Sequence, residues 1–238
     1  MSFARFKLLT FDVMGTLIDF EAGILAYLRE VPSSTTSRPS ERTILEASAR
    51  AEERLQAAAP EVPFTRQLAP IYEEIARELG FARGNGEGEG LRRSVARWPA
   101  FPDAVEALKR LRARFRLVAL TNADHWALDQ MARTLGDPFH DRVTAEDVGV
   151  CKPDPQVFAY CRGRQSVHGY RIEDFLHVAQ SQFHDIGIAK RLGFTVCWIE
   201  RRQGKDGPGA TPRVAEPTAP DYHFTSLAAL ADAVERDD

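Results

Sequence analysis

The chain has 238 residues, of which 44% are hydrophobic and 27% charged, and its formal net charge is −3. This composition is ordinary for a globular protein with a substantial core, and it argues against nucleic acid as a partner because no basic stretch is present. No apolar run is long enough for a membrane-spanning helix, so we expect no membrane partner.

The cysteines indicate the compartment. Cys151, Cys161 and Cys197 are odd in number and lack the spacing of metal ligands. Reduced thiols are typical of cytoplasmic proteins. The residues from Ser2 to Phe6 lead directly into the first apolar run, so we expect no signal peptide. We therefore predict a cytoplasmic location.

The first apolar run, Lys7–Phe11, has the length of a buried strand and ends at Asp12. Gly15 and Thr16 follow and indicate a turn. In a parallel α/β sheet, ligands bind outside the carboxyl ends of the strands, which makes Asp12 a candidate for chemistry. The alternative is that Asp12 only caps the turn.

Residues 20–98 show helical patterns and no strand pattern. We expect helices over Asp19–Leu28, Glu41–Ala59 and Phe64–Leu79. Alternating glycines predict a mobile loop further on, at Gly84, Gly86, Gly88 and Gly90. Because this insertion leaves the chain beside Asp12, we interpret residues 20–98 as a helical cap domain over that turn. A helical extension elsewhere on the surface is the alternative.

The remaining residues, 1–19 and 99–238, alternate strands with helices. Asp103 is placed to cap a helix through Leu111, and Asp185 begins another. The later strands are expected at Phe115–Leu120, Arg142–Thr144, Phe175–Ala179, Phe194–Ile199 and Tyr222–Phe224. Strands alternating with helices predict a doubly wound parallel sheet, a Rossmann-like α/β core.

Polar residues follow several of these strands and are expected in one crevice. A lysine such as Lys152 can keep the carboxylate of Asp12 ionised beside a second acid, Asp185. Thr16 and Thr121 are short donors suited to holding a carboxylate. Asp185 can orient Lys152 or activate a water molecule. The alternative is a structural ion pair between Lys152 and Asp185, with Thr121 as a helix cap.

The stretch Asp12-Val-Met-Gly-Thr16 resembles the first signature of the haloacid dehalogenase superfamily, whose hydrolases carry a nucleophilic Asp followed by x-x-Gly-Thr. Thr121-Asn122, Lys152 and Asp185 are similar to its second, third and fourth signatures, in the same order. The resemblance implies that Asp12 is the nucleophile of a hydrolase. Relatives often pair, so a homodimer formed through the cap is compatible with the sequence, although no residue requires it.

Met14 distinguishes branches of that superfamily. Its phosphatases carry a second Asp at this position, which donates a proton and helps to bind Mg²⁺, and a thioether can do neither. The 2-haloacid dehalogenases also lack that Asp and work without metal. The run from Lys152 to Phe158 is also most similar to this branch. The resemblance therefore implies an (S)-2-haloacid dehalogenase-like enzyme with no metal and no cofactor.

Several pocket positions depart from the dehalogenase pattern. Phe158 stands where those enzymes place a Tyr, and Gln180 and Gln182 replace a Ser and an Asn. His184 is a candidate proton donor to a poor leaving group such as an amine. The arginine that would receive a halide is not identified by the sequence, and the candidates are Arg42, Arg50, Arg54 and Arg66. The predicted substrate-binding residues are Met14, Asn122, Phe158, Ser181, Gln182 and His184.

The sequence thus predicts a metal-independent hydrolase that attacks the α-carbon of a small 2-substituted carboxylic acid and forms an aspartyl ester. A 2-haloacid is the default substrate. One alternative keeps the mechanism and cleaves a C–N bond, as in ring opening of L-azetidine-2-carboxylate. Further alternatives are a Mg²⁺-dependent phosphatase and a silent binding module, which has no need of a buried carboxylate with its counter-charge.

Overall fold

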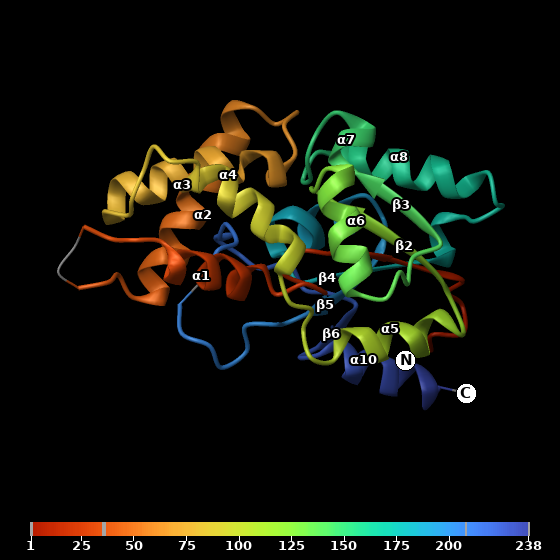
Figure 1. Cartoon of the computed structure of the whole chain (residues 1–238). Helices are drawn as coiled ribbons and strands as arrows, with labels where there is room; N and C mark the ends of the chain where they lie inside the picture. Colours follow the sequence, from red (N-terminus) through yellow and green to blue (C-terminus); the bar gives the residue numbers. More distant parts are fainter. Residues whose placement is uncertain (1, 35–36, 208, 238) are drawn as a thin grey trace.

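A parallel sheet forms the centre of the computed structural model, which describes residues 2–34, 37–207 and 209–237 (Figure 1). Its order is β3-β2-β1-β4-β5-β6, with every neighbouring pair parallel. The strands are β1 (Leu8–Phe11), β2 (Arg116–Thr121), β3 (Asp141–Thr144), β4 (Phe175–Ala179), β5 (Thr195–Ile199) and β6 (Tyr222–Phe224). The first strand is central because the chain winds outward from it in both directions, so the predicted doubly wound α/β fold is confirmed.

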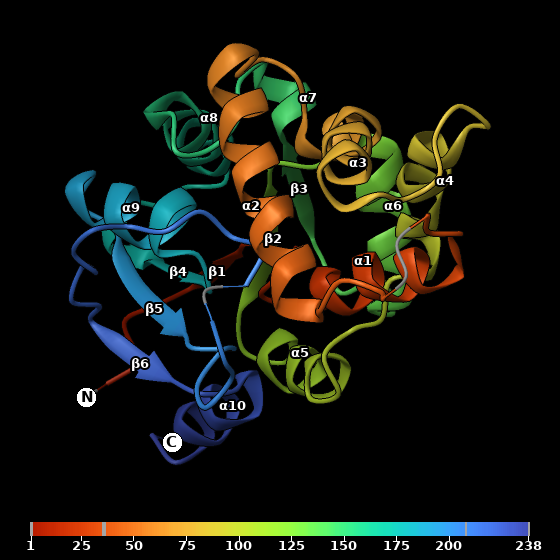
Figure 2. The same cartoon turned by 90° about the vertical axis from the view of Figure 1, so that its left-hand side faces the viewer.

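Successive strand residues point to opposite sides of the sheet, and both faces of this sheet are buried. Leu9 and Phe11 pack in one hydrophobic cluster, and Leu8 packs in the other. Figure 2 shows α8 and α9 on one side of the sheet and α5 and α10 on the other. The helices of this part are α5 (Ala104–Arg112), α6 (His125–Thr134), α7 (Ala145–Val148), α8 (Pro155–Ser166), α9 (Gly187–Arg191) and α10 (Leu227–Glu235), with a 3-10 turn at Ile172–Asp174.

The described residues between Phe20 and Arg97 form helices, and the β-pairing within them is a single bridge between Ser33 and Phe81. They comprise α1 (Phe20–Glu30), α2 (Glu41–Ala58), α3 (Phe64–Leu79), α4 (Glu87–Ser94) and a 3-10 turn at Val95–Arg97. Asp19 caps α1 by accepting from Ala22 N, and Ser40 caps α2 by accepting from Thr43 N. The predicted helices are therefore present. In Figure 2, α2 lies across the carboxyl edge of the sheet, as the cap interpretation expects, and the domain division itself stays a prediction.

The prediction of a mobile loop through Gly88 and Gly90 was wrong, because both residues lie inside α4. A Cβ at Gly88 would lie 2.9 Å from the carbonyl oxygen of Ala69, and one at Gly90 would collide with the Tyr27 hydroxyl. These glycines let α4 approach α3 and α1 closely, which offsets the cost of glycine in a helix. Packing therefore overrides the local propensity for a loop.

Two local predictions near helix starts also need correction. Asp103 precedes α5 but makes no side-chain cap bond to it; its carboxylate accepts from Leu227 N at 2.7 Å, in the first turn of α10, and from Arg201 at 2.8 Å. The helix expected from Asp185 begins earlier, as a π-helical turn over Gln182–Ile186 that continues into α9. π-Helical turns occur frequently at functional sites.

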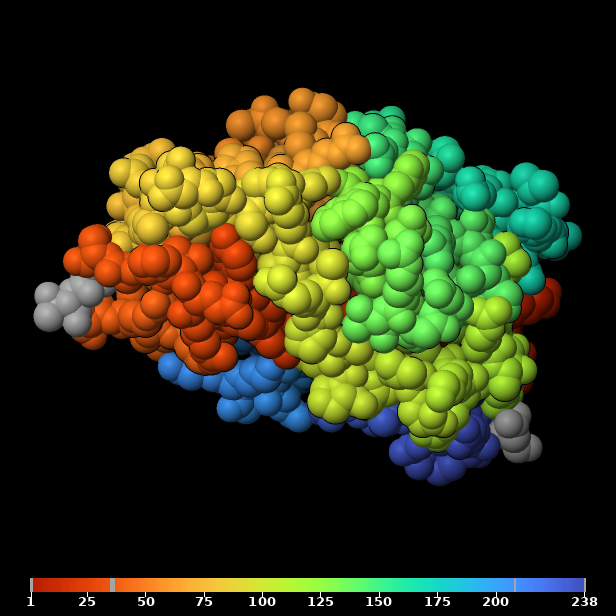
Figure 3. All heavy atoms as spheres, viewed as in Figure 1, coloured from red at the N-terminus to blue at the C-terminus, as the bar shows by residue number. Residues whose placement is uncertain are grey.

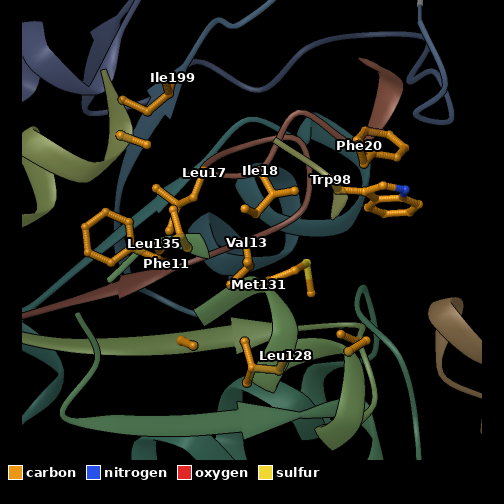
Figure 4. Packing of buried hydrophobic residues seen from close by; sticks show 14 of the residues in the cluster. Phe11, Val13, Leu17, Ile18, Phe20, Trp98, Leu128, Met131, Leu135 and Ile199 are labelled. Carbon is orange, nitrogen blue, oxygen red and sulfur yellow. The ribbon is translucent and has the colours of Figure 1, made fainter. Parts of the chain in front are cut away.

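The junction between α1 and the core depends on another close approach. Phe20 and Trp98 pack with ring centroids 6.3 Å apart, as the close-up in Figure 4 shows. A Cβ at Gly23 would lie 2.6 Å from Nε1 of Trp98 and closer still to its Cδ1. Trp98 is only 1% exposed, so it has little room to move away.

We therefore expect Gly23→Ala to lower the free energy of unfolding by about 1–3 kcal/mol, because overpacking outweighs the gain in helix propensity. Gly163→Ala is the matched control, since Gly163 lies in α8 with open space around its Cβ position. It should stabilise by up to about 1 kcal/mol. Urea unfolding measures both, and equal effects at the two positions would contradict this account of the junction.

The helical segment and the sheet pack against each other along a long boundary. On the face drawn in Figure 3, the yellow atoms around α4 lie directly against the green atoms of α5 and α6. Arg66 of α3 reaches Asp124, the cap residue of α6, at 3.3 Å. None of the described helices is both long and apolar enough to cross a membrane.

Candidate active site

Asp12 lies directly after β1, where its backbone N–H donates to Val178 O of the neighbouring strand at 3.1 Å. The chain then turns at Gly15, whose φ of 82° falls in the left-handed region that favours glycine. This turn returns Thr16 to Asp12, and the Thr16 hydroxyl donates to Asp12 Oδ2 at 2.6 Å. One oxygen of the strand-end carboxylate is thereby fixed by a residue four positions away.

Lys152 joins the two predicted acids. Its Nζ donates to Asp12 Oδ1 at 3.0 Å, to Asp185 Oδ1 at 2.6 Å and to the carbonyl oxygen of Leu120 at 2.8 Å. These contacts use all three N–H bonds of the ammonium group. Lys152 is 1% exposed and Asp185 is fully buried, so the predicted crevice holds a buried triad of one cation and two carboxylates.

The backbone of Lys152 is held as firmly as its side chain. Asn122 accepts from Lys152 N at 2.6 Å and donates to Lys152 O at 2.9 Å. Gln56 of α2 also donates to Lys152 O, at 2.7 Å. Nearby, Phe64 N donates to Asn122 O and Cys151 N donates to Pro60 O, each at 2.9 Å. The helical segment is thus tied to the two loops that carry Asn122 and Lys152.

His177 supports Asp185 from inside β4. Its Nε2 lies 3.0 Å from Asp185 Oδ1, and its Nδ1 lies 2.9 Å from the Thr10 hydroxyl. Because an ionised carboxylate only accepts, this network assigns the proton to Nε2. The sequence interpretation did not single out His177. A polar residue in the middle of an otherwise apolar strand was the signal that could have found it.

The triad perturbs its own ionisation. Burial raises the pKa of Asp12 above its ordinary value, and the nearby charge of Asp185 adds to this, while Lys152 opposes both. Burial also acts to raise the pKa of Asp185, but the charge of Lys152 and hydrogen bonds from His177 and Lys152 bring it down to about 2. Burial acts to lower the pKa of Lys152, yet the two carboxylates raise it. Lys152 and Asp185 are therefore a charged pair that steadies Asp12.

A cavity of about 30 Å³ lies above Asp12, enough for about two water molecules. Glu52 of α2 forms its roof, Phe20 of α1 and Phe64 of α3 also line it from the helical segment, and the remaining lining residues belong to the core. Met14, Asn122, Ser181 and His184 line it, as predicted for substrate-binding residues. The other lining residues are Asp12, Phe20, Glu52, Phe64, Lys152, Gln180, Asp185 and Thr211.

Three predicted site residues lie elsewhere. Phe158 is fully buried in the core, with its ring 5.3 Å from that of His177, so it supports β4 and does not line the cavity. Gln182 turns to the loop after β5, where its Oε1 accepts from Thr218 N at 3.0 Å. The Thr121 hydroxyl accepts from Ala123 N at 3.2 Å, and none of its hydrogen bonds among the described residues reaches Asp12.

The four arginines proposed to receive a halide all point away from the cavity. Each is about half exposed and pairs with acids that do not line the cavity. Arg42 pairs with Glu46 and Asp206, Arg50 with Glu78, Arg54 with Glu74, and Arg66 with Asp124 and Glu146. Among the described residues, Lys152 is the sole Arg or Lys lining the cavity. The expectation of a cap arginine in this site was therefore wrong.

An acid occupies the roof instead. Glu52 of α2 is only 7% exposed, and burial, followed by the charge of Asp12, raises its pKa to about 8. His184 Nε2 lies 3.6 Å from Glu52 Oε1 and 3.0 Å from Gln56 Oε1. Burial lowers the pKa of His184 to about 4, so it is neutral at pH 7. The sequence interpretation missed Glu52 and Gln56.

The part of the chain that the structure describes contains no group of three or more His, Cys, Asp or Glu arranged to hold a metal ion. Cys151, Cys161 and Cys197 are buried free thiols, and burial raises the pKa of Cys151 and Cys161 to about 12. They take no part in the site.

Comparison with known proteins identifies similar chains. A family model described as "haloacid dehalogenase-like hydrolase" matches residues 6–193. The (S)-2-haloacid dehalogenase of Pseudomonas fluorescens is 32% identical over 146 residues, which cover 60% of this chain and 63% of that enzyme. The 5-amino-6-(5-phospho-D-ribitylamino)uracil phosphatase of Escherichia coli (strain K12) is 27% identical over 210 residues, covering 84% and 86%.

Solved structures share the fold over nearly the whole chain. The L-2-haloacid dehalogenase of Xanthobacter autotrophicus with covalently bound chloropropionic acid superposes with a TM-score of 0.76 at 21% identity, covering 97% of this chain and 98% of that one. The chain aligns with less than two thirds of the length of the curated (S)-2-haloacid dehalogenases it matches first.

Proposed function

The chain belongs to the haloacid dehalogenase-like hydrolases, and we propose that it uses Asp12 to displace a leaving group from the α-carbon of a small 2-substituted carboxylic acid. The observation that carries this proposal is the arrangement of Asp12, with Lys152 on one oxygen and Thr16 on the other. A buried carboxylate held in this way is oriented and shielded from water, and the adjacent ammonium of Lys152 favours its charged form, as a nucleophile requires.

The reaction has two steps. An oxygen of Asp12 attacks the carbon in line, the bond to the leaving group breaks with its electron pair, and an aspartyl ester forms. Water then attacks the ester carbonyl of Asp12, which regenerates the carboxylate and releases a 2-hydroxy acid. Because the pKa of Asp185 is about 2, we assign it to orienting Lys152 and not to activating that water.

The phosphatase alternative requires Mg²⁺, which needs about six oxygen ligands in near-octahedral geometry. Lys152 and Thr16 already occupy both oxygens of Asp12, and Lys152 and His177 occupy Asp185 Oδ1. Among the described residues, Asp185 Oδ2 is the one carboxylate oxygen that is both fully shielded from solvent and without a partner, and Met14 contributes a thioether. This donor set fits Mg²⁺ poorly, so we derive no step through a metal and propose a metal-independent reaction.

A single turnover in ¹⁸O-water tests the proposal. With enzyme in excess over 2-chloropropionate or L-azetidine-2-carboxylate, and with EDTA present, we expect one ¹⁸O atom in the peptide that contains Asp12. The product should carry the unlabelled oxygen of Asp12. Asp12→Asn is the control, and it should show neither turnover nor label. Label passing directly into product, or activity on a phosphate monoester that appears only with Mg²⁺, would refute the mechanism.

The leaving group divides two candidates. Halide is the default because relatives named as 2-haloacid dehalogenases carry out that displacement. Cleavage of a C–N bond is favoured by one observation, the acid Glu52 in the roof where a cation was expected. The substrate on either reading is a small carboxylic acid. The buried, unpaired cysteines support a reducing compartment, and we place the enzyme in the cytoplasm.

A further inference from the structure

Glu52 is a largely buried acid that receives no hydrogen bond from the described residues. It lines the cavity from α2 and is only 7% exposed. Within the described residues no hydrogen bond to its carboxyl group is present, and its nearest polar neighbour is His184 Nε2 at 3.6 Å. Buried polar groups are normally paired, so an unpaired acid that faces a cavity indicates a partner that enters with the ligand.

His184 is not available to bind a ligand group, because both of its ring nitrogens already have hydrogen-bond partners in the protein. Gln56 donates from Nε2 to Lys152 O at 2.7 Å, which leaves Gln56 Oε1 as the acceptor that faces His184. His184 therefore carries its proton on Nε2 and donates it to Gln56 Oε1 at 3.0 Å. Its Nδ1 faces the Ser181 hydroxyl at 3.3 Å. The predicted proton-donor role of His184 is not supported by this network.

The charges around the cavity favour a cation. Three carboxyl groups line it, those of Asp12, Glu52 and Asp185, against a single ammonium, that of Lys152. All three N–H bonds of the Lys152 ammonium already donate to protein oxygens, those of Asp12, Leu120 and Asp185. A substrate that brings only a carboxylate and a halogen adds a negative charge to this set. A substrate that also brings an ammonium group supplies the missing positive charge.

We propose that Glu52 is the receptor for a positively charged nitrogen, and that the enzyme selects small carboxylic acids with an ammonium group on the carbon that Asp12 attacks. This inference rests on the proposed function of Asp12. In-line attack places the leaving atom on the far side of the carbon from Asp12, and Glu52 is the acid that lines the cavity from α2, the helix that lies across the strand ends in Figure 2. Glu52 is therefore a specificity residue.

Ring opening of a cyclic ammonium acid balances with these groups. An oxygen of Asp12 forms a bond to the α-carbon, and the C–N electron pair passes to nitrogen, which becomes the neutral amine of the opened chain. Water hydrolyses the ester, and the proton it releases passes to that amine. The net reaction adds one water molecule to the ring compound. Because an amine leaves poorly, a strained four-membered ring is the fitting substrate class.

The number of protons released on binding distinguishes two occupants of the space beside Glu52, the ammonium group proposed here and a substrate carboxylate. An ammonium group stabilises the carboxylate of Glu52, so binding should release the proton that a pKa of about 8 keeps on Glu52 at pH 7. A substrate carboxylate placed against Glu52 would instead stabilise the neutral acid, so binding would take up a proton or leave the balance unchanged.

The other titratable groups that face Glu52 contribute little to the number of protons exchanged on binding. Asp12, Lys152 and Asp185 face it from the core, His184 from the π-helical turn, and Cys151 from beside Lys152. The pKa values of Asp185, His184 and Cys151 lie at about 2, 4 and 12, far from pH 7. Asp12 is removed from the count by using the unreactive variant Asp12→Asn, in which Glu52 stays buried.

Calorimetric titration of Asp12→Asn at pH 7, in buffers with different ionisation enthalpies, measures the linked protons. Burial, the larger cause of the raised pKa of Glu52, still acts in this variant, so we expect L-azetidine-2-carboxylate to release protons, up to one per molecule bound. Cyclobutanecarboxylate, which has the same shape without the nitrogen, should bind at least tenfold more weakly and release none. In the double variant that carries both Asp12→Asn and Glu52→Gln, the proton release should be absent. Proton uptake, or equal binding of the two acids, would overturn the proposal, as would no binding of either.

Kinetics of the otherwise unchanged enzyme supply the second readout. Glu52→Gln should raise KM for L-azetidine-2-carboxylate about 100-fold with kcat within a few-fold, and Glu52→Asp should recover part of the loss. Glu53→Gln, the exposed neighbour on α2, should change neither. If Glu52→Gln leaves KM for L-azetidine-2-carboxylate unchanged while Asp12 still becomes labelled, this inference fails while the function of Asp12 stands. If no substrate labels Asp12, the proposed function itself fails.

Discussion

Lys152→Met should lower turnover by about 10²- to 10³-fold and the free energy of unfolding by about 3–5 kcal/mol. The methionine fills a similar volume but leaves two buried carboxylates, Asp12 and Asp185, without their counter-charge. One of them must then take up a proton, and Asp12, whose pKa is already raised, is the one that does so. A protonated Asp12 is no nucleophile, so stability and activity are lost through the same contact. Urea unfolding and steady-state kinetics at pH 7 measure the two effects.

Lys190→Met is the matched control, because Lys190 pairs with Asp221 at the surface, where the side chains are 37% and 32% exposed. Its effect on unfolding should stay within about 1 kcal/mol, and turnover should not change. A Lys152→Met protein as stable as the parent would show that Asp12 and Asp185 do not carry the charges assigned to them.

Glu52→Gln should stabilise the protein at neutral pH, by roughly 3 kcal/mol at pH 7. The unfolded chain releases the Glu52 proton near its ordinary pKa of 4.5, whereas the folded chain keeps it until about pH 8. Between these values the unfolded state binds fewer protons, so the stability of the parent protein falls as the pH rises. Below pH 4 both states are protonated and the variant should gain almost nothing. Above pH 8 the gain should be constant.

Urea unfolding of the parent and Glu52→Gln from pH 4 to 9 measures this difference. Glu53→Gln, one position along the exposed side of α2, should give a difference near zero across the range. A gain for Glu52→Gln that does not depend on pH would mean that Glu52 is ionised in the folded state or reaches water. The expected result would mean that the fold keeps, at a cost in stability, an acid that a neutral residue could replace.

The core could be predicted from the sequence because its signals are local. β1 and β4 read as apolar runs of strand length, and the polar residues at their ends, Asp12 and Ser181, lie at the carboxyl edge by the geometry of a parallel sheet alone. Lys152 and Asp185 were found through their resemblance to family signatures. Their partners His177 and Gln56 were not, because side-chain pairing between distant segments leaves little trace in sequence.

The roof of the site illustrates what local patterns leave undecided. Glu52 and Glu53 are adjacent and chemically identical, and only the packing of α2 determines which of them faces the cavity. A signal was present, because Glu52 falls on the helical stripe that buries Ile44, Leu45, Ser48 and Ala51. An acid on an apolar stripe indicates a buried, functional carboxyl group.

Positions carried over from family patterns were the least secure. Phe158 occupies the place of a pocket tyrosine, but without a hydroxyl it packs wholly among apolar neighbours against His177 and Phe194. Gln182 is longer than the asparagine it replaces and reaches the backbone of Thr218. In both cases the new side chain found a better partner away from the cavity.

The hydrogen bond between Gln56 of α2 and the backbone of Lys152 also affects how a substrate enters the cavity. α2 carries Glu52 into the cavity beside Asp12, so a movement of this helix changes how an acid reaches the nucleophile. Lifting α2 parts Gln56 from Lys152 O and loosens the backbone that aims the ammonium at Asp12. The alignment of the nucleophile therefore depends on the position of α2: with the helix seated as in this structure, Asp12 is 5% exposed and is held by both Lys152 and Thr16.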